Sequence, residues 1–244
     1  ADKVNYNGSD CYSFKCRVNA AERTKKVNAV LHCNDWTGQT YSYSVYDYAS
    51  KILAEPESSE YRSSAPLIKA MLNYGGYAQT YFNENTDALA NKGLYNKTND
   101  PVLTTNTTVS KDYNYAVFNN NMGVSFLGGS LVLNSGTDLK LYYGIDDKNV
   151  AHNINVSVNG QNVAPEYDGN IMCVRVPGIS ISSLGDTYNV KISVNGKEIN
   201  QKYSAMTYMY KALNAQNSNT KLNNVVKALY LYNEAAKQYS MGIE

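Results

Sequence analysis

The chain has 244 residues, with 22 basic and 21 acidic side chains and no basic run or stripe. This balance argues against nucleic acid or an anionic membrane surface as a partner, because both bind through a positive patch. No stretch approaches about 18 apolar residues in a row, so we expect no membrane insertion. The 23 tyrosines fit a secreted or glycan-binding protein and fit equally a compositional habit of the source proteome.

The first part of the sequence predicts two strands followed by two helices. An irregular start is expected over residues 1–10, and strands are expected at 11–18 and 26–32. A polar turn follows at 34–39, and the helices are expected at 45–53 and 67–82. Ser44 is placed to cap the first helix, with Asp47 three residues on as its capping-box partner. The second helix carries an apolar stripe from Leu67 to Tyr81 at helical spacing, so it must bury one face.

Two consecutive glycines interrupt the second of these helices. Gly75 and Gly76 each cost roughly 1 kcal/mol relative to alanine inside a helix. Such a pair predicts a close crossing or a bend at this point. The residues that follow, 83–94, form a short helical or looped excursion that Gly93 ends.

A polar segment separates this part from the rest of the sequence. Residues 96–110 are rich in threonine and asparagine and contain Pro101. They are the best candidate boundary between a first half, residues 1–100, and a second half, residues 101–244. We expect the two halves to form one compact unit.

The middle of the sequence alternates in the way of an antiparallel sheet that buries one face. Strands are expected at residues 113–118, 123–126, 130–134, 139–143, 154–158, 172–176 and 190–194. Asn159-Gly160 and Asn195-Gly196 mark two-residue hairpins, because a type I′ turn needs positive φ at both central positions.

The C-terminal part repeats the helical part of the first half. Three segments match three earlier ones in the same order and at nearly the same spacing: 192–200 with 30–39, 204–213 with 44–53, and 225–240 with 67–82. We therefore expect an α+β fold with a pseudo-duplicated module, built from antiparallel β-sheets and two pairs of packed helices. Helices this short are marginal alone and need a packing partner.

The four cysteines leave the redox state open. Cys11 and Cys16 fall on opposite faces of one expected strand, so we do not expect them to bond each other. No CxxC pair occurs, which argues against a zinc or redox motif. Free thiols and disulfides that involve Cys33 and Cys173 both remain open.

No familiar catalytic or metal motif occurs in the sequence. Nucleophile-elbow, zinc-protease, phosphate-loop and dinucleotide patterns are absent. His32 and His152 have no adjacent acid, and Asp146-Asp147 stands in a predicted turn, where carboxylates are ordinarily solvated. Residues 83–87 alternate oxygen-bearing side chains as the first half of an EF-hand calcium loop does. The match fails because Ala88 and Leu94 stand at the sixth and twelfth loop positions, where that loop has glycine and glutamate. We therefore expect no enzyme, no cofactor and no metal site.

The strongest candidate for ligand contact is the only tryptophan. Trp36 stands in a polar turn with Asn34, Asp35 and Gln39, and it is followed by Tyr41 and Tyr43. Flat aromatic rings pack on the apolar face of a sugar, while amide and carboxylate groups bind its hydroxyls. The alternative is that Trp36 caps the hydrophobic core at the entry to a helix.

The helical segments resemble a recurrent module of large surface proteins of gut Firmicutes. The likeness rests on SVYDYASKIL, PLIKAMLNYGGYAQTYF with NTDALAN, SAMTYMYKAL and VVKALYLYNEAAKQYS. Proteins of this kind include the starch-adherence proteins of the Ruminococcus amylosome, which bind starch without cleaving it. The resemblance implies a secreted or cell-surface module beside other domains, and it assigns no binding residue. Trp36 is not part of the module pattern.

The sequence thus predicts a non-catalytic module that binds polysaccharide, with starch-type α-glucan as the expected ligand. Trp36 with Tyr41 or Tyr43 would stack on glucose, and Asn34, Asp35 or Gln39 would bind its hydroxyls. The alternative is a structural or protein-interaction module of a large surface protein. A glycoside-active enzyme, which needs two carboxylates at a set separation, is a third hypothesis.

Overall fold

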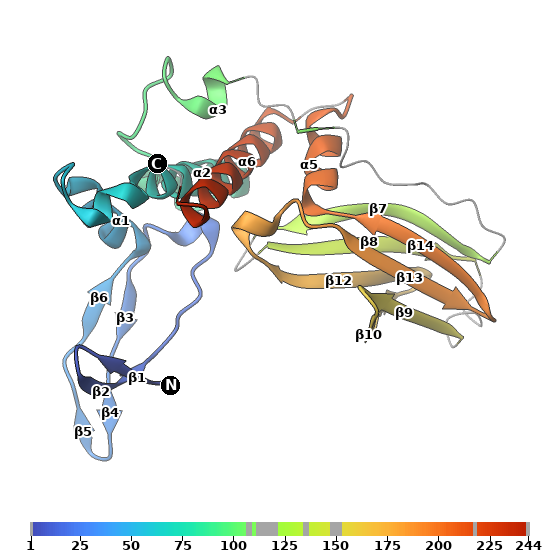
Figure 1. Cartoon of the computed structure of the whole chain (residues 1–244), viewed down its shortest axis with the longest axis horizontal. Helices are drawn as coiled ribbons and strands as arrows, with labels where there is room; N and C mark the ends of the chain where they lie inside the picture. The colour runs from blue at the N-terminus through green and yellow to red at the C-terminus, as the bar shows by residue number, and fades with distance from the viewer. Residues whose placement is uncertain are drawn as a thin grey trace.

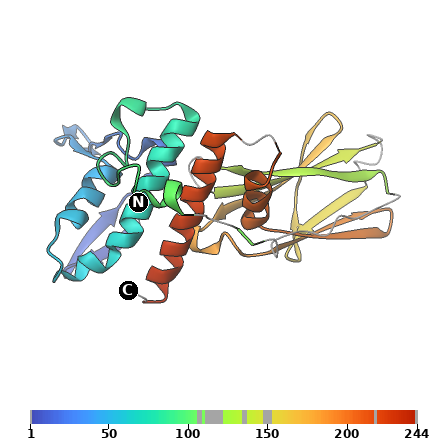
Figure 2. The same cartoon turned by 90° about the horizontal axis from the view of Figure 1, so that it is seen from above.

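The computed structural model describes residues 2–105, 109–110, 122–133, 137–146, 153–216 and 219–242. An N-terminal arm of short strands, a central group of helices and a β-sandwich follow one another in space (Figure 1). Two long helices lie side by side between the arm and the sandwich in both views (Figure 2). Helices and antiparallel sheets occur together, which confirms the expected α+β class.

The arm consists of two antiparallel ribbons. The first pairs β1 with β2, and the second pairs β3 with β6 and, further out, β4 with β5. The six strands are β1 (Asp2–Tyr6), β2 (Ser9–Ser13), β3 (Val27–Ala29), β4 (His32–Cys33), β5 (Trp36–Thr37) and β6 (Tyr41–Tyr43). Such two-stranded ribbons are marginally stable in water without a further layer to pack on.

An Asn-Gly pair folds the start of the chain. Asn7 and Gly8 have φ angles of 49° and 81°, as a type I′ turn requires, and the strands on either side pair in register. The expectation of an irregular start over residues 1–10 is therefore wrong. The strand expected at 11–18 also ends earlier, at Ser13.

Five α-helices are described, together with four short 3₁₀ turns. The α-helices are α1 (Val45–Ala54), α2 (Ala65–Phe82), α3 (Pro101–Thr104), α5 (Ala205–Leu213) and α6 (Thr220–Ser240). The 3₁₀ turns are η1 (Ala20–Glu22), η2 (Glu60–Ser64), η3 (Thr86–Ala88) and η5 (Ile181–Ser183). The capping box predicted for α1 is confirmed, since Asp47 N–H donates to Ser44 Oγ at 3.0 Å and Ser44 N–H donates to Asp47 Oδ2 at 2.8 Å.

Helix α2 packs against α6, and their contact includes a stacked pair of tyrosines. The rings of Tyr74 and Tyr232 are 6.0 Å apart at an interplanar angle of 28°. The guanidinium of Arg23, just after η1, lies 5.1 Å from the first ring and 5.5 Å from the second. It also donates to the Met71 carbonyl. Burial lowers the pKa of Arg23, because desolvation penalises its charged form.

The glycine pair in α2 allows a close approach, although its neighbours there are not α6. A Cβ at Gly75 would lie 3.2 Å from both Ala90 Cβ and Arg23 Cδ. A Cβ at Gly76 would lie 2.0 Å from the side-chain oxygen of Asn91. The predicted close contact is therefore present, and it is made by the segment after α2 and the segment around η1.

The sandwich is formed by two four-stranded antiparallel sheets. Their strand orders are β11-β12-β8-β7 and β10-β9-β13-β14. The strands are β7 (Val124–Val132), β8 (Thr137–Ile145), β9 (Ile154–Val158), β10 (Gln161–Val163), β11 (Glu166–Asp168), β12 (Ile171–Ile179), β13 (Tyr188–Val194) and β14 (Lys197–Tyr203). The hairpins predicted at 159–160 and 195–196 are both confirmed.

The predicted alternation matches the interior of this sandwich. Leu139, Leu141 and Tyr143 of β8 are fully buried, as are the inward residues of β13. The two strands expected at 123–126 and 130–134 are instead one strand, β7, with a register irregularity near Gly128. The strand expected at 113–118 lies outside the described residues.

Aromatic and polar side chains join the two sheets. The Tyr143 hydroxyl on β8 donates to Gln201 Oε1 on β14 at 2.6 Å. Phe126 on β7 has its ring centroid 5.4 Å from that of Tyr143 and 5.8 Å from that of Tyr203. These contacts across the layers fix how the two sheets face each other.

The expected boundary segment includes a buried carboxylate. Asp100 accepts hydrogen bonds from Asn73 Nδ2 at 3.0 Å, from the Tyr77 hydroxyl at 2.6 Å and from Val102 N–H at 2.9 Å. Burial, together with the Asp100 carboxylate, raises the pKa of Tyr77. The start of α3 is thus fastened to α2, and α3 itself packs on α6.

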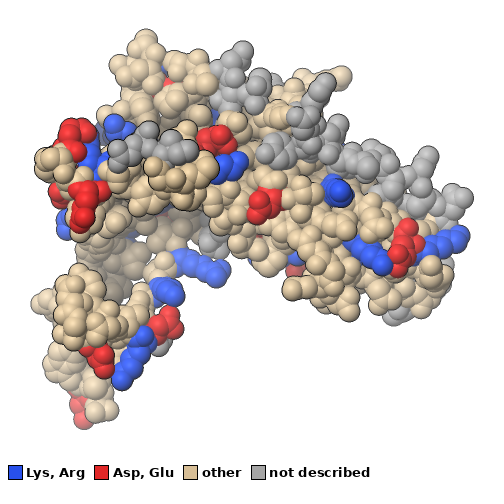
Figure 3. Space-filling view, in the orientation of Figure 1, with Lys and Arg blue, Asp and Glu red and all other residues tan. Residues whose placement is uncertain are grey.

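Within the ranges given above, no helix is long and apolar enough to cross a lipid bilayer. On the face drawn in Figure 3, acidic and basic side chains are interspersed over the arm, the helices and the sandwich. The ion pairs in this part of the chain include Lys25 with Glu84, at 2.9 Å, and Lys191 with Glu198, at 2.6 Å.

Candidate functional site

The six residues expected to bind a ligand all lie on the second ribbon of the arm. Asn34 and Asp35 form its two-residue turn, with Asn34 at φ 54°. The turn expected over 34–39 is therefore shorter than predicted, because Trp36 and Thr37 continue into β5 and pair with Cys33 and His32. The tip of the arm thus presents a tryptophan directly beside an amide and a carboxylate.

Trp36 is 58% exposed and packs on the backbone of its own ribbon. A Cβ at Gly38 would lie 2.6 Å from Trp36 Cη2, so only glycine leaves room for the ring there. The idea that Trp36 caps the hydrophobic core does not fit this position, because the ring belongs to neither buried cluster. The ring is instead supported by the ribbon beneath it and open to a ligand.

Tyr41 and Tyr43 are placed further along the ribbon, on β6. Tyr41 pairs with Ala29 and Tyr43 pairs with Val27, so both rings project from the same face of the strand. Lys51 of α1 lies over the Tyr43 ring with its Nζ 4.9 Å from the centroid. Gln39 is exposed between this pair and the tip. The six residues therefore spread along the arm and do not enclose one pocket.

The arm exposes apolar residues beyond Trp36, Tyr41 and Tyr43. Its large exposed hydrophobic side chains are Val4, Tyr6, Tyr12, Phe14, Val30, Leu31, Trp36, Tyr41 and Tyr43. In the first ribbon, Tyr12 lies on the face opposite to Val4 and Tyr6, because it pairs with Lys3 whereas Val4 pairs with Cys11. Exposed apolar side chains that gather on one part of a molecule commonly mark an interaction site. The signal that could have found it is the Asn7-Gly8 turn, which places Tyr12 and Phe14 on one face of a hairpin.

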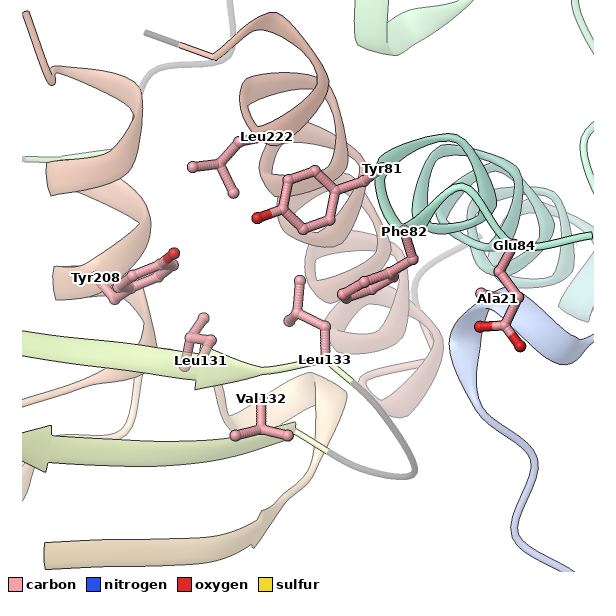
Figure 4. Close-up of a pocket in the computed structure, with 9 residues that line it drawn as sticks. All are labelled: Ala21, Tyr81, Phe82, Glu84, Leu131, Val132, Leu133, Tyr208 and Leu222. Atoms are coloured by element: carbon pink, nitrogen blue, oxygen red, sulfur yellow. The ribbon is translucent and has the colours of Figure 1, made fainter. Parts of the chain in front are cut away.

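A separate cavity of about 380 Å³ lies where the end of α2 meets β7, α5 and α6 (Figure 4). Its larger lining side chains are Tyr81, Phe82, Leu131, Leu133, Tyr208 and Leu222. The two tyrosine hydroxyls point into it, and burial raises the pKa of Tyr208. Glu84 at its rim is paired with Lys25. The lining is therefore mainly apolar and contains no catalytic pair of carboxylates among the residues described.

No grouping of metal ligands accompanies either surface. In the described part of the chain, no three His, Cys, Asp or Glu side chains come together. His32 is exposed, and its Nδ1 is 3.0 Å from Thr37 Oγ1. Asp146 is described, whereas Asp147 and His152 lie outside the described residues.

The cysteines are all free thiols in this structure. Cys16 and Cys33 are exposed on the arm, and Cys11 is half-buried there. Cys173 lies on the outer face of the sheet that contains β12, opposite Tyr142, and partial burial there raises the pKa of its thiol. Three of the four thiols therefore belong to the arm and one to the sandwich.

The exposed arm surface and the cavity beside β7 are thus two candidate sites among the described residues. Comparison with protein families, with curated proteins and with solved structures found no match to this chain.

Proposed function

We propose that the chain is a structural and protein-interaction module of a larger secreted or cell-surface protein, and that it is not an enzyme. The observation that carries this proposal is the apolar face of the arm. This face consists of Tyr12, Phe14, Leu31, Tyr41 and Tyr43. Their counterparts in the C-terminal half are buried in the sandwich, and they are Val174, Val176, Ile192, Gln201 and Tyr203. The counterparts follow from the internal duplication, which we propose as the origin of both halves.

Recurring hydrogen bonds support the duplication. Tyr46 N–H, in the first turn of α1, donates to the Arg23 carbonyl at 2.9 Å. Met206 N–H, in the first turn of α5, donates to the Leu184 carbonyl at 3.0 Å. Both acceptors directly follow a 3₁₀ turn, and both helices begin with a serine capping box. The turn η1 packs on α2, as η5 packs on α6.

Strand register supports the same correspondence. Tyr43 pairs with Val27 on the arm, and Tyr203 pairs with Tyr188 in the sandwich. Tyr43 directly precedes the capping serine of α1, and Tyr203 directly precedes that of α5. The ribbon β3–β6 therefore corresponds to β13–β14. The ribbon β1–β2 corresponds to β11–β12 by its two-residue turn.

Exposure differs sharply between matched positions. Tyr43 is 41% exposed and Tyr203 is 1% exposed. Phe14, six residues after the arm's first turn, is 73% exposed, whereas Val176, six residues after the matching turn, is 7% exposed. Residues suited to a protein interior thus face outward on the arm. Burying one such side chain is worth roughly 1.5–3 kcal/mol, so the arm is suited to bind another protein surface.

The proposal predicts that the native chain binds the apolar dye ANS through the arm. Replacing Tyr12 and Phe14 together with serine should lower the dye fluorescence by about half or more, because it removes two of the most exposed large apolar side chains of the arm. Tyr61→Ser and Tyr239→Ser are the matched controls, since both tyrosines are exposed away from the arm. Equal loss in the controls, or no dye binding by the native chain, would contradict the proposal.

Polysaccharide binding, with starch-type α-glucan as ligand, is the second candidate function. It is favoured by the position of Trp36. Trp36 and Lys197 are each the first residue after the two-residue turn of their ribbon, and Lys197 is exposed. Exposure of Trp36 is therefore not explained by a missing interior. Its ring is supported by Gly38, with Asn34 and Asp35 beside it. Tyr41 and Tyr43 are also explained as interior residues, because their counterparts Gln201 and Tyr203 are buried.

Affinity electrophoresis in gels that contain amylopectin tests this second function. If Trp36 is the sugar platform, Trp36→Ala should weaken retardation about tenfold or more, because a central aromatic anchor typically carries about 2 kcal/mol of binding free energy. Tyr61→Ala is the control and should migrate as the native chain does. Retardation that Trp36→Ala leaves unchanged would remove the site, and no retardation of the native chain would remove the function.

A further inference from the structure

We propose that the arm is one part of a second β-sandwich, which is completed by two further strands. One would pair with β2 as β8 pairs with β12, and the other would pair with β3 as β9 pairs with β13. These strands would lie ahead of β1 on the same polypeptide. The inference rests on the proposed function, because it names the partner of the same apolar face.

The pairing pattern of the sandwich shows where such strands would attach. Strand β12 lies between β11 and β8, and β13 lies between β14 and β9. On the arm, β2 pairs only with β1, and β3 pairs only with β6, among the described strands. Strand β12 pairs with β8 along one edge and β13 pairs with β9 along one edge, and the corresponding edges of β2 and β3 have no strand beside them within the described part of the chain. Open edges of this kind accept a further strand through backbone hydrogen bonds.

The side chains beside these edges have the character of an interior. Leu31, four residues after Val27, matches Ile192, four residues after Tyr188. Tyr12 likewise matches Val174, counted from the hairpin turns. Ile192 and Val174 are fully buried, and β8 and β9 are the strands that pair with theirs. Two strands added beside β2 and β3 in the same arrangement would bury Tyr12 and Leu31 in one interior.

The order of elements identifies the source of the strands. In the C-terminal half, β8 and β9 come before β11 along the chain, and β11 is the counterpart of β1. The same order places the completing pair ahead of β1. A second copy of this chain is a poorer donor, because its β8 lies between β7 and β12 and its β9 lies between β10 and β13.

A chimera tests the proposal with strands of known sequence. A second copy of residues 122–165 is fused in front of Val4, the counterpart of Glu166, and amide exchange is followed by mass spectrometry. We expect exchange in β2 and β3 to slow about tenfold or more, while ANS fluorescence falls. The control chimera carries Leu139→Ser, Leu141→Ser and Val156→Ser in the added copy only, and its arm should exchange as in the unmodified chain.

A second chimera is needed because the arm residues differ in size from their counterparts in the sandwich, so the added strands could fail to pack on them. In it, arm residues take the identities of their counterparts: Tyr12→Val, Phe14→Val, Leu31→Ile and Tyr41→Gln. No slowing in either chimera would overturn the proposal, as would a dimer of the unmodified chain whose arm is protected from exchange. If the unmodified chain binds ANS through the arm and the chimeras fail, the interaction surface stands and only this partner is wrong. If it binds no ANS, the proposed function fails as well.

Discussion

Tyr203→Ala is expected to lower the free energy of unfolding by about 3–5 kcal/mol, whereas Tyr43→Ala should lower it by less than about 1 kcal/mol. The two tyrosines occupy matching positions, each one residue before a capping serine. Tyr203 is buried between the sheets against Phe126, so its loss leaves a cavity. Tyr43 loses only an exposed ring and its contact with Lys51, which is worth about 0.5–1 kcal/mol.

Urea unfolding followed by circular dichroism measures both effects. Tyr203→Phe and Tyr43→Phe serve as controls, because they keep the ring and remove only the hydroxyl. A loss at Tyr43→Ala as large as at Tyr203→Ala would mean that the arm already contributes a packed core, which contradicts the proposed function. The comparison needs no knowledge of the partner.

Gly76→Leu is expected to lower the free energy of unfolding by about 2–4 kcal/mol. A Cβ at this position would lie 2.0 Å from Asn91 Oδ1, so the asparagine must move. Asn91 Nδ2 donates to Asn73 Oδ1 at 2.9 Å, and Asn73 in turn donates to Asp100. Overpacking costs about 1–3 kcal/mol and breaking a buried hydrogen bond about 1–3 kcal/mol, offset by roughly 1 kcal/mol of helix propensity.

A double-mutant cycle assigns the effect to this contact. Asn91→Ala removes the obstructing side chain, so in that background Gly76→Ala should be neutral or stabilising by up to about 1 kcal/mol. In the native background the same change should destabilise. The cycle is measured by thermal unfolding of Gly76→Ala, Asn91→Ala and the double variant. If the two losses of stability simply add in the double variant, Asn91 is not the side chain for which Gly76 leaves room.

Local sequence signals predicted much of this fold because they act over a few residues. The Ser44 capping box, the Asn159-Gly160 and Asn195-Gly196 hairpins and the alternation of β8 each depend on neighbouring residues only. The strand at Trp36 escaped prediction because strands of two residues have no measurable period. The turn at Asn7-Gly8 carried the same signal as the other two hairpins. Strand β1 before it was missed and β2 after it was predicted only in part, because the alternation around the turn is weak.

The candidate site was harder to predict, because burial depends on distant strands. Tyr43 and Tyr203 have the same residue type, the same register and the same following cap, yet one is exposed and the other is buried. The difference arises from β8, which faces β14 across the sandwich, and from β9, which pairs with β13. Both strands are remote from the β13–β14 ribbon in sequence. Residue type alone could therefore select aromatic candidates such as Tyr41. It could not distinguish an aromatic residue that binds a ligand from one that belongs to an interior whose second layer is missing.

The central claim is that the arm carries an interior face with no layer over it. Amide hydrogen exchange of the unmodified chain, read separately for the arm and the sandwich, tests this most directly. We expect peptides from β2, β3 and β6 to exchange at least about 100-fold faster than the matching peptides from β12, β13 and β14, because two-stranded ribbons open locally with little cost. Equal protection of the matched peptides would contradict the claim.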